Sequence, residues 1–245
     1  MKKLIAIIAI LAFATTVFAT ESDPSETVGF VKIDADVGYT SFGLPFTFYD
    51  ALHAQTMALD DIIGNQFTGG ALFFQSDQIM DINSGAIGWY NTGSSTWMGT
   101  LTSFVANHAN YAYVLSGHPN VDMYLAGQVD QSTINFGTMG VGYNVVGIRE
   151  AGEVSVADLD LVSSGFTGGA LFFQSDQIMD INSGAIGWYN TGSSTWMGTL
   201  TTITPGHTYY VYVLSTHTPF DWTYDPTGAK ASKSTNVIKV KANKR

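Results

Sequence analysis

The stretch FTGGALFFQSDQIMDINSGAIGWYNTGSSTWMGTLT, residues 67–102, decides the architecture because it recurs letter for letter as residues 166–201. The register continues beyond the identical block, since residues 111–116 correspond to residues 210–215 at the same offset of 99 residues. A period this long is typical of tandem domains rather than of a solenoid, whose repeats are about 20–50 residues long. We therefore expect two modules, over residues 27–124 and 125–226. They follow an N-terminal segment over residues 20–26 and precede a tail over residues 227–245.

Within each module the local signals favour β-strands. Short runs rich in β-branched and aromatic residues are separated by Gly, Asn, Asp and Ser, a pattern typical of sandwiches and barrels. The sequence predicts an all-β fold of two tandem antiparallel β-sandwich-like modules with Greek-key or meander connections. Helical turns are expected only in residues 52–63 and 154–162. The strands expected in the first module are residues 28–33, 40–44, 71–75, 78–82, 87–90, 96–98 and 111–115.

One hairpin can be assigned a register from the sequence. Its turn lies at residues 92–95, so that Asn91 pairs with Thr96. Tyr90 then lies opposite Trp97 on one face, and Trp89 lies opposite Met98 on the other. The same pairing must recur in the second copy.

Composition and charge exclude several classes of function. The 245 residues include no Cys, which excludes thiolate zinc sites, disulfides and a cysteine nucleophile. All 20 acidic residues lie between Glu21 and Asp225, where the cations are Lys32 and Arg149, so this body carries a formal charge of −18. Such a body repels nucleic-acid phosphates and anionic lipid. The tail carries the opposite charge, with six Lys or Arg residues and no acid.

The N-terminus has the features of a secretory signal peptide. Lys2 and Lys3 precede an apolar run over residues 4–14, and Val17 and Ala19 suit a signal-peptidase site. We expect residues 1–19 to be removed and the mature protein to be secreted, extracellular or on the cell surface. No later apolar run reaches the roughly 20 residues that span a bilayer, so we expect no transmembrane segment.

Three further patterns are similar to a module of bacterial secreted and surface proteins. Residues 38–46 read GYTSFGLPF, residues 76–79 read SDQI, and residues 205–210 read PGHTYY. These segments resemble the "GWNLVSLPF"-like, "DQIQxW"-like and "PGxxYW" signatures of those modules. The first copy departs from the last signature, because residues 106–110 read ANHAN. The resemblance implies secretion and a β-rich fold, and it implies no particular activity.

An acidic pattern offers one candidate metal site in each module. Oxygen-rich loops of this kind suit Ca²⁺, although the carboxylate that completes an EF-type loop is absent. The alternative is a turn in which Asp and Asn bond their own backbone. No other cofactor is expected. The candidate ligands are Asp77, Asp81 and Asn83, with their copies Asp176, Asp180 and Asn182.

No catalytic constellation is evident, so we expect no enzymatic activity. Only four Glu are present and none lies in the duplicated block, while two identical modules are unusual for one glycosidase site. His108 and His118, with their copies His207 and His217, are expected to be loop residues rather than metal ligands.

The function expected is that of a secreted, non-catalytic structural or interaction protein of the cell surface or extracellular matrix. Identical surfaces repeated in quasi-translational series suit head-to-tail association with itself into a filament. The basic tail segment Val237, Ile238, Lys239, Val240 and Lys241 can add as a strand to an acidic neighbour. The alternative is a carbohydrate-binding or adhesion module, in which polysaccharide stacks on Tyr90 or Trp97 and on their copies Tyr189 or Trp196.

Overall fold

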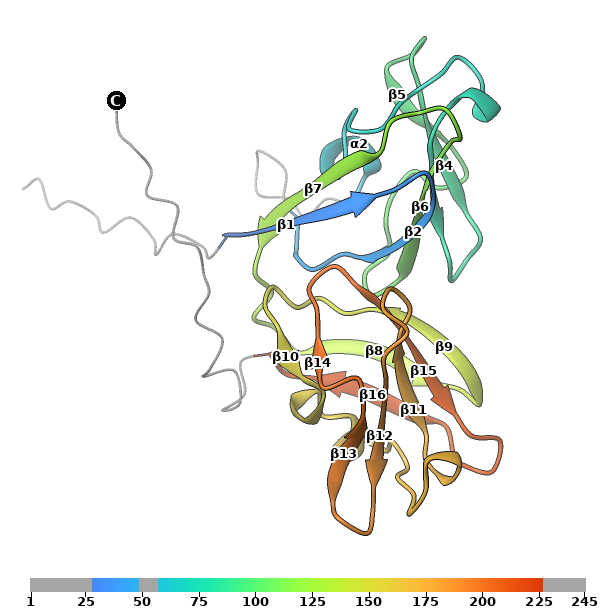
Figure 1. Ribbon diagram of the computed structural model, residues 1–245. Coiled ribbons are helices and arrows are strands. Elements are labelled where there is room, and N and C mark those ends of the chain that lie inside the picture. Colours follow the sequence, from blue (N-terminus) through green and yellow to red (C-terminus); the bar gives the residue numbers. More distant parts are fainter. Residues whose placement is uncertain (1–27, 49–56, 227–245) are drawn as a thin grey trace, which may run out of the picture.

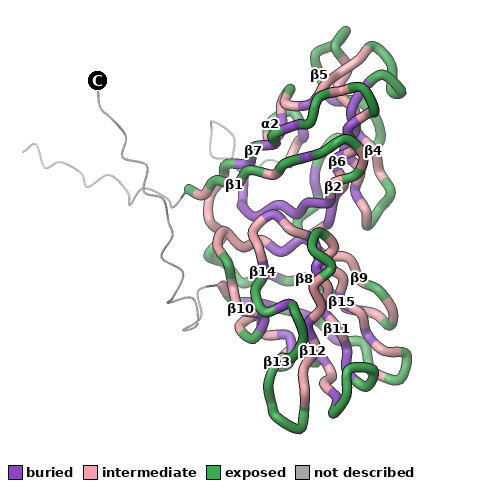
Figure 2. The backbone as a smooth tube through the Cα atoms, viewed as in Figure 1, coloured by how far each residue is buried: buried purple, intermediate pink, exposed green. Residues whose placement is uncertain are grey.

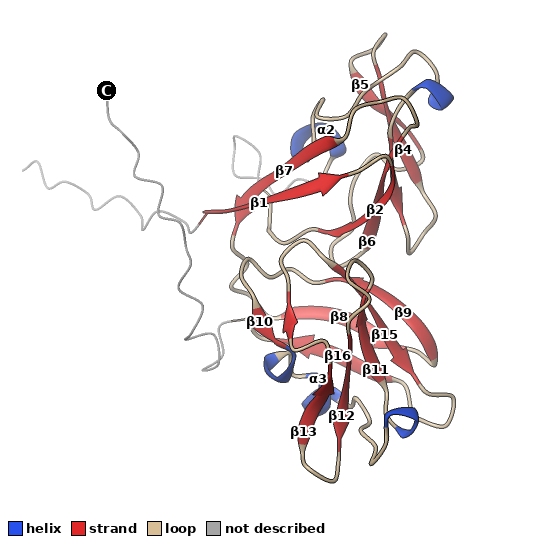
Figure 3. Ribbon diagram, viewed as in Figure 1, coloured by secondary structure: helices blue, strands red, loops and turns tan. Residues whose placement is uncertain are grey.

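A computed structural model describes residues 28–48 and 57–226, and these residues form two modules built mainly from antiparallel strands (Figure 3). This confirms the expected all-β, sandwich-like fold class. Module 1 covers the described residues up to 128, and module 2 covers residues 134–226. The elements of module 1 are β1 (Val28–Ala35), β2 (Gly38–Gly43), α2 (Leu59–Ile62), the 3₁₀ turn η1 (Phe73–Gln75), β3 (Gln78–Asp81), β4 (Ile87–Asn91), β5 (Thr96–Gly99), β6 (Ala109–Val114) and β7 (Val121–Gln128).

Module 2 repeats this order with small additions. Its elements are β8 (Ile134–Met139), β9 (Gly142–Gly147), β10 (Val154–Ser155), the 3₁₀ turn η2 (Val156–Asp158), α3 (Leu161–Ser164), the 3₁₀ turn η3 (Phe172–Gln174), β11 (Gln177–Asp180), β12 (Ile186–Asn190), β13 (Thr195–Gly198), β14 (Thr202–Ile203), β15 (Thr208–Val213) and β16 (Phe220–Tyr224).

Each module is a two-layer sandwich. In module 1 a five-stranded sheet has the order β2-β6-β3-β4-β5, and β1 pairs with β7 as a separate ribbon. In module 2 the corresponding orders are β9-β15-β11-β12-β13 and β8-β16, and β10 pairs with β14. All of these pairings are antiparallel. Strands β3 to β5 form a meander, while β6 returns to lie between β2 and β3, so that the sheet is not a simple meander.

The core lies between the two layers because side chains alternate along each strand. On β7, Val121, Met123 and Leu125 are buried and the residues between them are exposed. They pack against Phe42 and Ile79 of the five-stranded sheet. Module 2 has its own core, in which Trp222 and Tyr209 are fully buried. The turn that joins β12 to β13 is exposed (Figure 2).

The structure corrects some of the predicted elements. Residues 71–75 do not form a strand: residues 71–72 are bends, and Phe73–Gln75 form the exposed turn η1, after which Ser76 N donates to the carbonyl oxygen of Phe73. The strand β7, which sequence reasoning missed, continues past the expected module boundary at residue 124 to Gln128. Residues 52–56 lie outside the described part of the chain, and the helical turn expected there is limited to α2. Among the described residues there is no helix long and apolar enough to cross a membrane.

The two modules contact each other through equivalent residues. Gly43 N donates to Gly206 O at 2.9 Å, and Gly147 N donates to Asn107 O at 2.8 Å. Gly43 corresponds to Gly147 in the sheet order, and Asn107 corresponds to Gly206 at the offset of 99 residues. Each module therefore supplies the equivalent donor to one hydrogen bond and the equivalent acceptor to the other, which is the pattern of an isologous, two-fold contact.

This reciprocity fixes how the modules are arranged. Sheet strands β2 and β6 face β9 and β15 near the centre of the molecule, and β5 and β13 lie at its opposite ends (Figure 1). The expectation that identical surfaces follow one another in quasi-translational series is wrong for the described residues, because a two-fold contact turns the second module around. Such a contact closes after two copies, so it does not generate an open filament.

Candidate functional site

Asp77, one of the expected metal ligands, is a buried structural residue. Its Oδ1 accepts hydrogen bonds from Leu115 N at 2.9 Å and from His118 Nδ1 at 2.8 Å, and its Oδ2 accepts from Thr68 N at 2.9 Å. The copy Asp176 has the same three partners one repeat later, with His217 Nδ1 at 2.7 Å. The carboxylate therefore joins the loop before β3 to the end of β6.

Asp81 has a similar role at the other end of β3. Its Oδ2 accepts from His108 Nδ1 at 2.7 Å, and its Oδ1 accepts from Asn83 N at 2.8 Å. Burial raises the pKa of Asp81, but the hydrogen bonds from His108, Ser84 and Asn83 outweigh that effect and hold the pKa below its usual value. The copy Asp180, which pairs with His207 at 2.9 Å, has its pKa lowered for the same reasons.

These contacts change the interpretation of the acidic pattern and of the histidines. Asp77 directly precedes β3 and Asp81 is its last residue, which separates their Cα atoms by roughly 13 Å, so they do not share one ion. Among the described residues there is no cluster of three or more His, Asp or Glu that could hold a metal ion. The expected alternative, turns in which Asp bonds its own backbone, describes Asp81 and Asp180. The four histidines are not free loop residues, because each orients its ring against a buried aspartate.

The expected metal ligands Asn83 and Asn182 lie at the contact between the modules. Asn83 Nδ2 donates to Val145 O at 2.8 Å, and Asn182 Nδ2 donates to Ser41 O at 2.7 Å. Their Oδ1 atoms accept from the backbone N–H groups of Ala109 and Thr208, so both ends of each amide are engaged. These two residues are therefore part of the reciprocal contact and not of an ion site.

The hairpin register is as predicted, and it separates the aromatic side chains into two groups. Tyr90 pairs with Trp97, and Trp89 pairs with Met98. Trp97 faces the core and is only 6% exposed, with ring contacts to Phe67 and Tyr90. This corrects the expectation that Trp97 is a stacking platform for a ligand. The outward ring of the hairpin belongs to Trp89.

Trp89 belongs to a row of side chains that crosses all five strands. Directly paired residues point to the same face of a sheet, and here the pairs run Tyr39–Tyr113, Tyr113–Gln78, Gln78–Trp89 and Trp89–Met98. We call these five residues row 1. Four gaps between strands make it roughly 19 Å long. Tyr39 is 63% exposed, and Tyr113 and Trp89 are partly exposed.

Module 2 presents the equivalent row, which we call row 2. It consists of Tyr143, Tyr212, Gln177, Trp188 and Met197, paired in the same order. Tyr143 is 65% exposed, and Phe172 of the exposed turn η3 lies edge-on to Trp188 with ring centroids 6.3 Å apart. Sequence reasoning missed both rows, although cross-strand pairing of the aromatic residues on β6 and β15 was a signal for them.

The two rows meet at the centre of the molecule. The Tyr39 ring lies 5.5 Å from that of Tyr111, and the Tyr143 ring lies 5.4 Å from that of Tyr210. Burial raises the pKa of Tyr111, and the proximity of Tyr210 raises it further. The closeness of Tyr111 and Tyr210 joins the rows into one tyrosine-rich surface that is shared by the modules.

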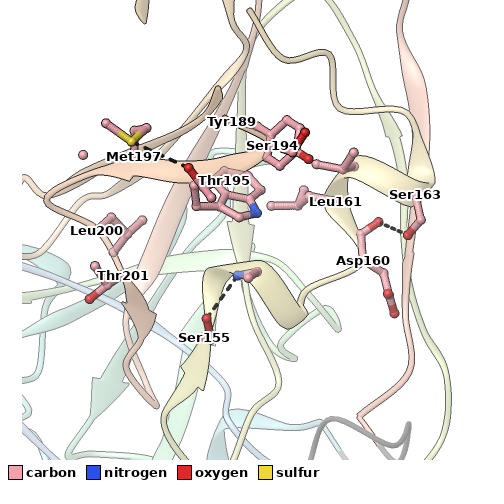
Figure 4. A pocket seen from close by; sticks show the side chains of 14 residues that line it. Ser155, Asp160, Leu161, Ser163, Tyr189, Ser194, Thr195, Met197, Leu200 and Thr201 are labelled. Atoms are coloured by element: carbon pink, nitrogen blue, oxygen red, sulfur yellow. Dashed lines mark hydrogen bonds between the residues drawn. The ribbon is translucent and has the colours of Figure 1, made fainter. Parts of the chain in front are cut away.

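A pocket of about 710 Å³ lies in module 2 between α3 and the hairpin β12–β13. Tyr189, Thr195 and Trp196 line it on the hairpin side, and Asp160 and Ser163 line it on the α3 side, where the Ser163 hydroxyl donates to Asp160 O (Figure 4). A second hollow of about 720 Å³ lies between the modules and is lined by His108 and Asn83. Of the residues expected to contact a ligand, Tyr189 and Trp196 therefore line a pocket, whereas Trp97 is buried in the core.

Glu150 and Asp130 are the carboxylates most similar to a catalytic pair. Burial raises the pKa of Glu150 to about 7, the Tyr224 hydroxyl that donates to it opposes this shift, and the charge of Asp130 adds to it. Asp130 is half-buried and accepts from Arg149 Nη1 at 2.8 Å, while Arg149 Nε donates to Asn107 Oδ1 at 3.1 Å. Neither carboxylate lines either of the two hollows. Through Arg149, these hydrogen bonds connect Asp130, in the linker between the modules, to Asn107 of module 1.

The basic segment expected to mediate assembly, residues 237–241, lies outside the described residues, as does the expected signal peptide. The candidate site thus consists of the two aromatic rows with their tyrosine-rich centre, and of the pocket at Trp196. Comparison of the chain with protein-family models, with curated proteins and with solved structures finds no match.

Proposed function

We propose that this chain is a secreted, non-catalytic interaction protein that binds neutral polysaccharide of a cell surface or extracellular matrix on rows 1 and 2. The observation that carries the proposal is the outward row of Tyr39, Tyr113 and Trp89, repeated residue for residue in module 2. The bacterial surface modules that the sequence resembles are consistent with this location. The resemblance remains a prediction.

Aromatic rings on a flat sheet suit sugar rings. The C–H face of a pyranose packs on an aromatic ring, and a polar tip beside that ring bonds the sugar hydroxyls. In row 2 the partly exposed Gln177 lies between Tyr212 and Trp188. The equivalent Gln78 of row 1 is only 7% exposed, so the polar tips of that row are the tyrosine hydroxyls. A row roughly 19 Å long accommodates several sugar rings in succession. Polymers are therefore favoured over single sugars as ligands of the rows.

The charge of the protein and the two-fold contact restrict the class of polysaccharide further. The body of the protein carries a formal charge of −18, which disfavours anionic polymers such as uronates and sulfated glycans. The two-fold contact holds both rows in one molecule, so binding of one row raises the effective concentration of the same polymer at the other. A weak interaction at each row then gives a firm attachment.

Support for a non-catalytic role comes from the polar groups of the modules. The buried aspartates at β3 and β11 are occupied by histidines and backbone N–H groups. In the described part of the chain, no Ser or Thr hydroxyl is hydrogen-bonded to any of the four histidine rings. An activated-serine arrangement, which needs that bond, is therefore not part of the proposal.

The test is affinity electrophoresis of the mature protein in gels that contain neutral polysaccharides, together with sedimentation on insoluble cellulose, starch or mannan. We expect at least one polymer to retard the protein. The double variant Trp89→Ala and Trp188→Ala should bind about ten-fold or more weakly, as expected for loss of central aromatic contacts.

A matched control is Tyr124→Ala. Tyr124 is an exposed aromatic residue on β7 that stacks on Phe30, outside both rows. The Tyr124→Ala variant should be retarded in the gel as strongly as the wild type. The proposal is overturned if no neutral polymer retards the wild type, or if the folded double variant is retarded as strongly as the wild type.

A further inference from the structure

Identical sequences in the two modules have different surroundings at one place, the tryptophan of the second hairpin strand. Trp97 in module 1 and Trp196 in module 2 both lie within the duplicated block. Trp97 is buried, whereas Trp196 is partly exposed and lines the pocket of about 710 Å³. A difference between identical segments must come from the residues around them.

Two acceptors close the site in module 1. Trp97 Nε1 donates to Gly64 O at 2.7 Å, and Trp97 N donates to Asp60 Oδ1 at 3.3 Å. Gly64 has a φ of +58°, in the left-handed region that glycine adopts without strain. The chain after α2 therefore turns back over the indole and covers it.

Among the described residues, neither hydrogen bond has a counterpart in module 2. Ala58 pairs with Ser103 and Ser155 pairs with Thr202, so Ala157 stands where module 1 has Asp60. The segment from there to Phe166 is two residues longer than the segment to Phe67 in module 1. Leu159 is buried in the core, and Ser163 belongs to α3, where its hydroxyl donates to Asp160 O at 2.9 Å. Within the described residues the Trp196 indole has no hydrogen-bond partner, so its N–H remains available at the pocket.

We propose that this pocket is a binding site for a single sugar unit, specifically a neutral monosaccharide or the terminal unit of an oligosaccharide, and that module 1 has no counterpart. Only the class of ligand rests on the proposed function. The walls provide the two kinds of contact that a sugar ring uses. Tyr189 and Trp196 offer aromatic surface, and the hydroxyl oxygens of Ser163 and Thr195, which already donate to or contact protein atoms, offer acceptors for sugar hydroxyls (Figure 4).

The size and position of the pocket agree with this ligand. Its volume lies within the range of about 300–1,000 Å³ that is typical of small-molecule sites. It lies between α3 and the core-facing side of the hairpin, and Trp196 is on the opposite face of the sheet from Trp188 of row 2. A short sugar in the pocket and a polymer on the row therefore contact different side chains.

The experiment is isothermal titration calorimetry of the mature full chain with glucose, galactose, mannose, N-acetylglucosamine and their disaccharides. We expect one of these sugars to bind with a stoichiometry of one per chain. Trp196→Ala should weaken binding at least ten-fold, and so should Ser163→Trp, which fills the pocket from an exposed position. Trp97→Phe, the matched change in module 1, should leave binding unchanged.

The inference is overturned if no short sugar binds saturably, if wild type binds two per chain, or if Trp97→Phe weakens binding as much as Trp196→Ala.

The failure of this inference is distinguishable from the failure of the proposed function. The double variant Trp89→Ala and Trp188→Ala should lose polymer retardation and keep short-sugar binding, while Trp196→Ala should show the reverse. Polymer retardation without short-sugar binding rejects the pocket alone. Short-sugar binding without polymer retardation rejects the rows alone.

Discussion

The buried carboxyl of Glu150 makes the stability of module 2 depend on pH in the opposite direction from an ordinary paired carboxylate. Its pKa is raised from an ordinary 4.5 to about 7, chiefly by burial. Its Oε1 is buried and has no hydrogen-bond partner among the described residues, so the ionised form is poorly compensated. The folded state therefore holds a proton that the unfolded chain releases.

The difference between the pKa of Glu150 in the folded and unfolded chains sets the direction and size of the change in stability with pH. Below pH 4.5 both states are protonated and the full stability is present. As pH rises from 4.5 through about 7, the unfolded state is favoured, and about 3 kcal/mol of the free energy of unfolding is lost. The lowered pKa values of Asp81 and Asp180 act the other way and at lower pH, because their stabilisation is lost as pH falls below the ordinary value of 3.8.

The perturbation is Glu150→Gln, which keeps the shape and an oxygen that accepts from Tyr224. Urea unfolding from pH 4 to pH 8 should give equal free energies for variant and wild type at the acid end. The variant should be more stable by about 3 kcal/mol at pH 8. Other titrating groups cancel in this difference. Tyr224→Phe is a second variant, and it should steepen the loss of stability because it removes a hydrogen bond that lowers the pKa of Glu150. A difference between Glu150→Gln and wild type that does not change with pH would refute the reasoning.

Two further predictions concern the frame of the molecule. A Cβ at Gly147 would lie 2.5 Å from the carbonyl oxygen of His108, so Gly147→Ala should separate the modules at a cost of about 1–3 kcal/mol. Small-angle scattering should then show a longer particle, whereas Gly140→Ala, where the nearest atom is 3.8 Å away, should not change the scattering. Asp77→Ala removes the acceptor of three donors and should cost about 3 kcal/mol or more by urea unfolding. Added Ca²⁺ should not change the Tm of the wild type, and a Tm that rises with Ca²⁺ would show that the acidic loops do bind the ion.

The strand pattern and the hairpin register were predictable because they depend on neighbouring residues. Alternation and a four-residue turn suffice to place Tyr90 opposite Trp97 and Trp89 opposite Met98. Which ring faces the core was not predictable. It depends on the β1–β7 ribbon that covers one face of the sheet, and those strands are separated by about ninety residues.

The sites were less predictable because their partners are distant in sequence. Asp77 resembles an ion ligand until His118, which lies 41 residues away, occupies it. The surroundings of Trp97 and Trp196 differ because the segments that precede the duplicated block differ, although the hairpins themselves are identical. Local pattern therefore identified the residue types of the site, and tertiary contacts decided their roles.

The reciprocal contact also determines what a fragment of this chain can do. Asn83, Asn107, Ser41 and Gly43 supply both halves of the contact within one module, because each half is copied in the other. We therefore expect each module, produced alone, to offer both halves of the contact to a second copy of itself. In the intact chain the other module already occupies this contact, so a partner of the same kind is always present at equal dose.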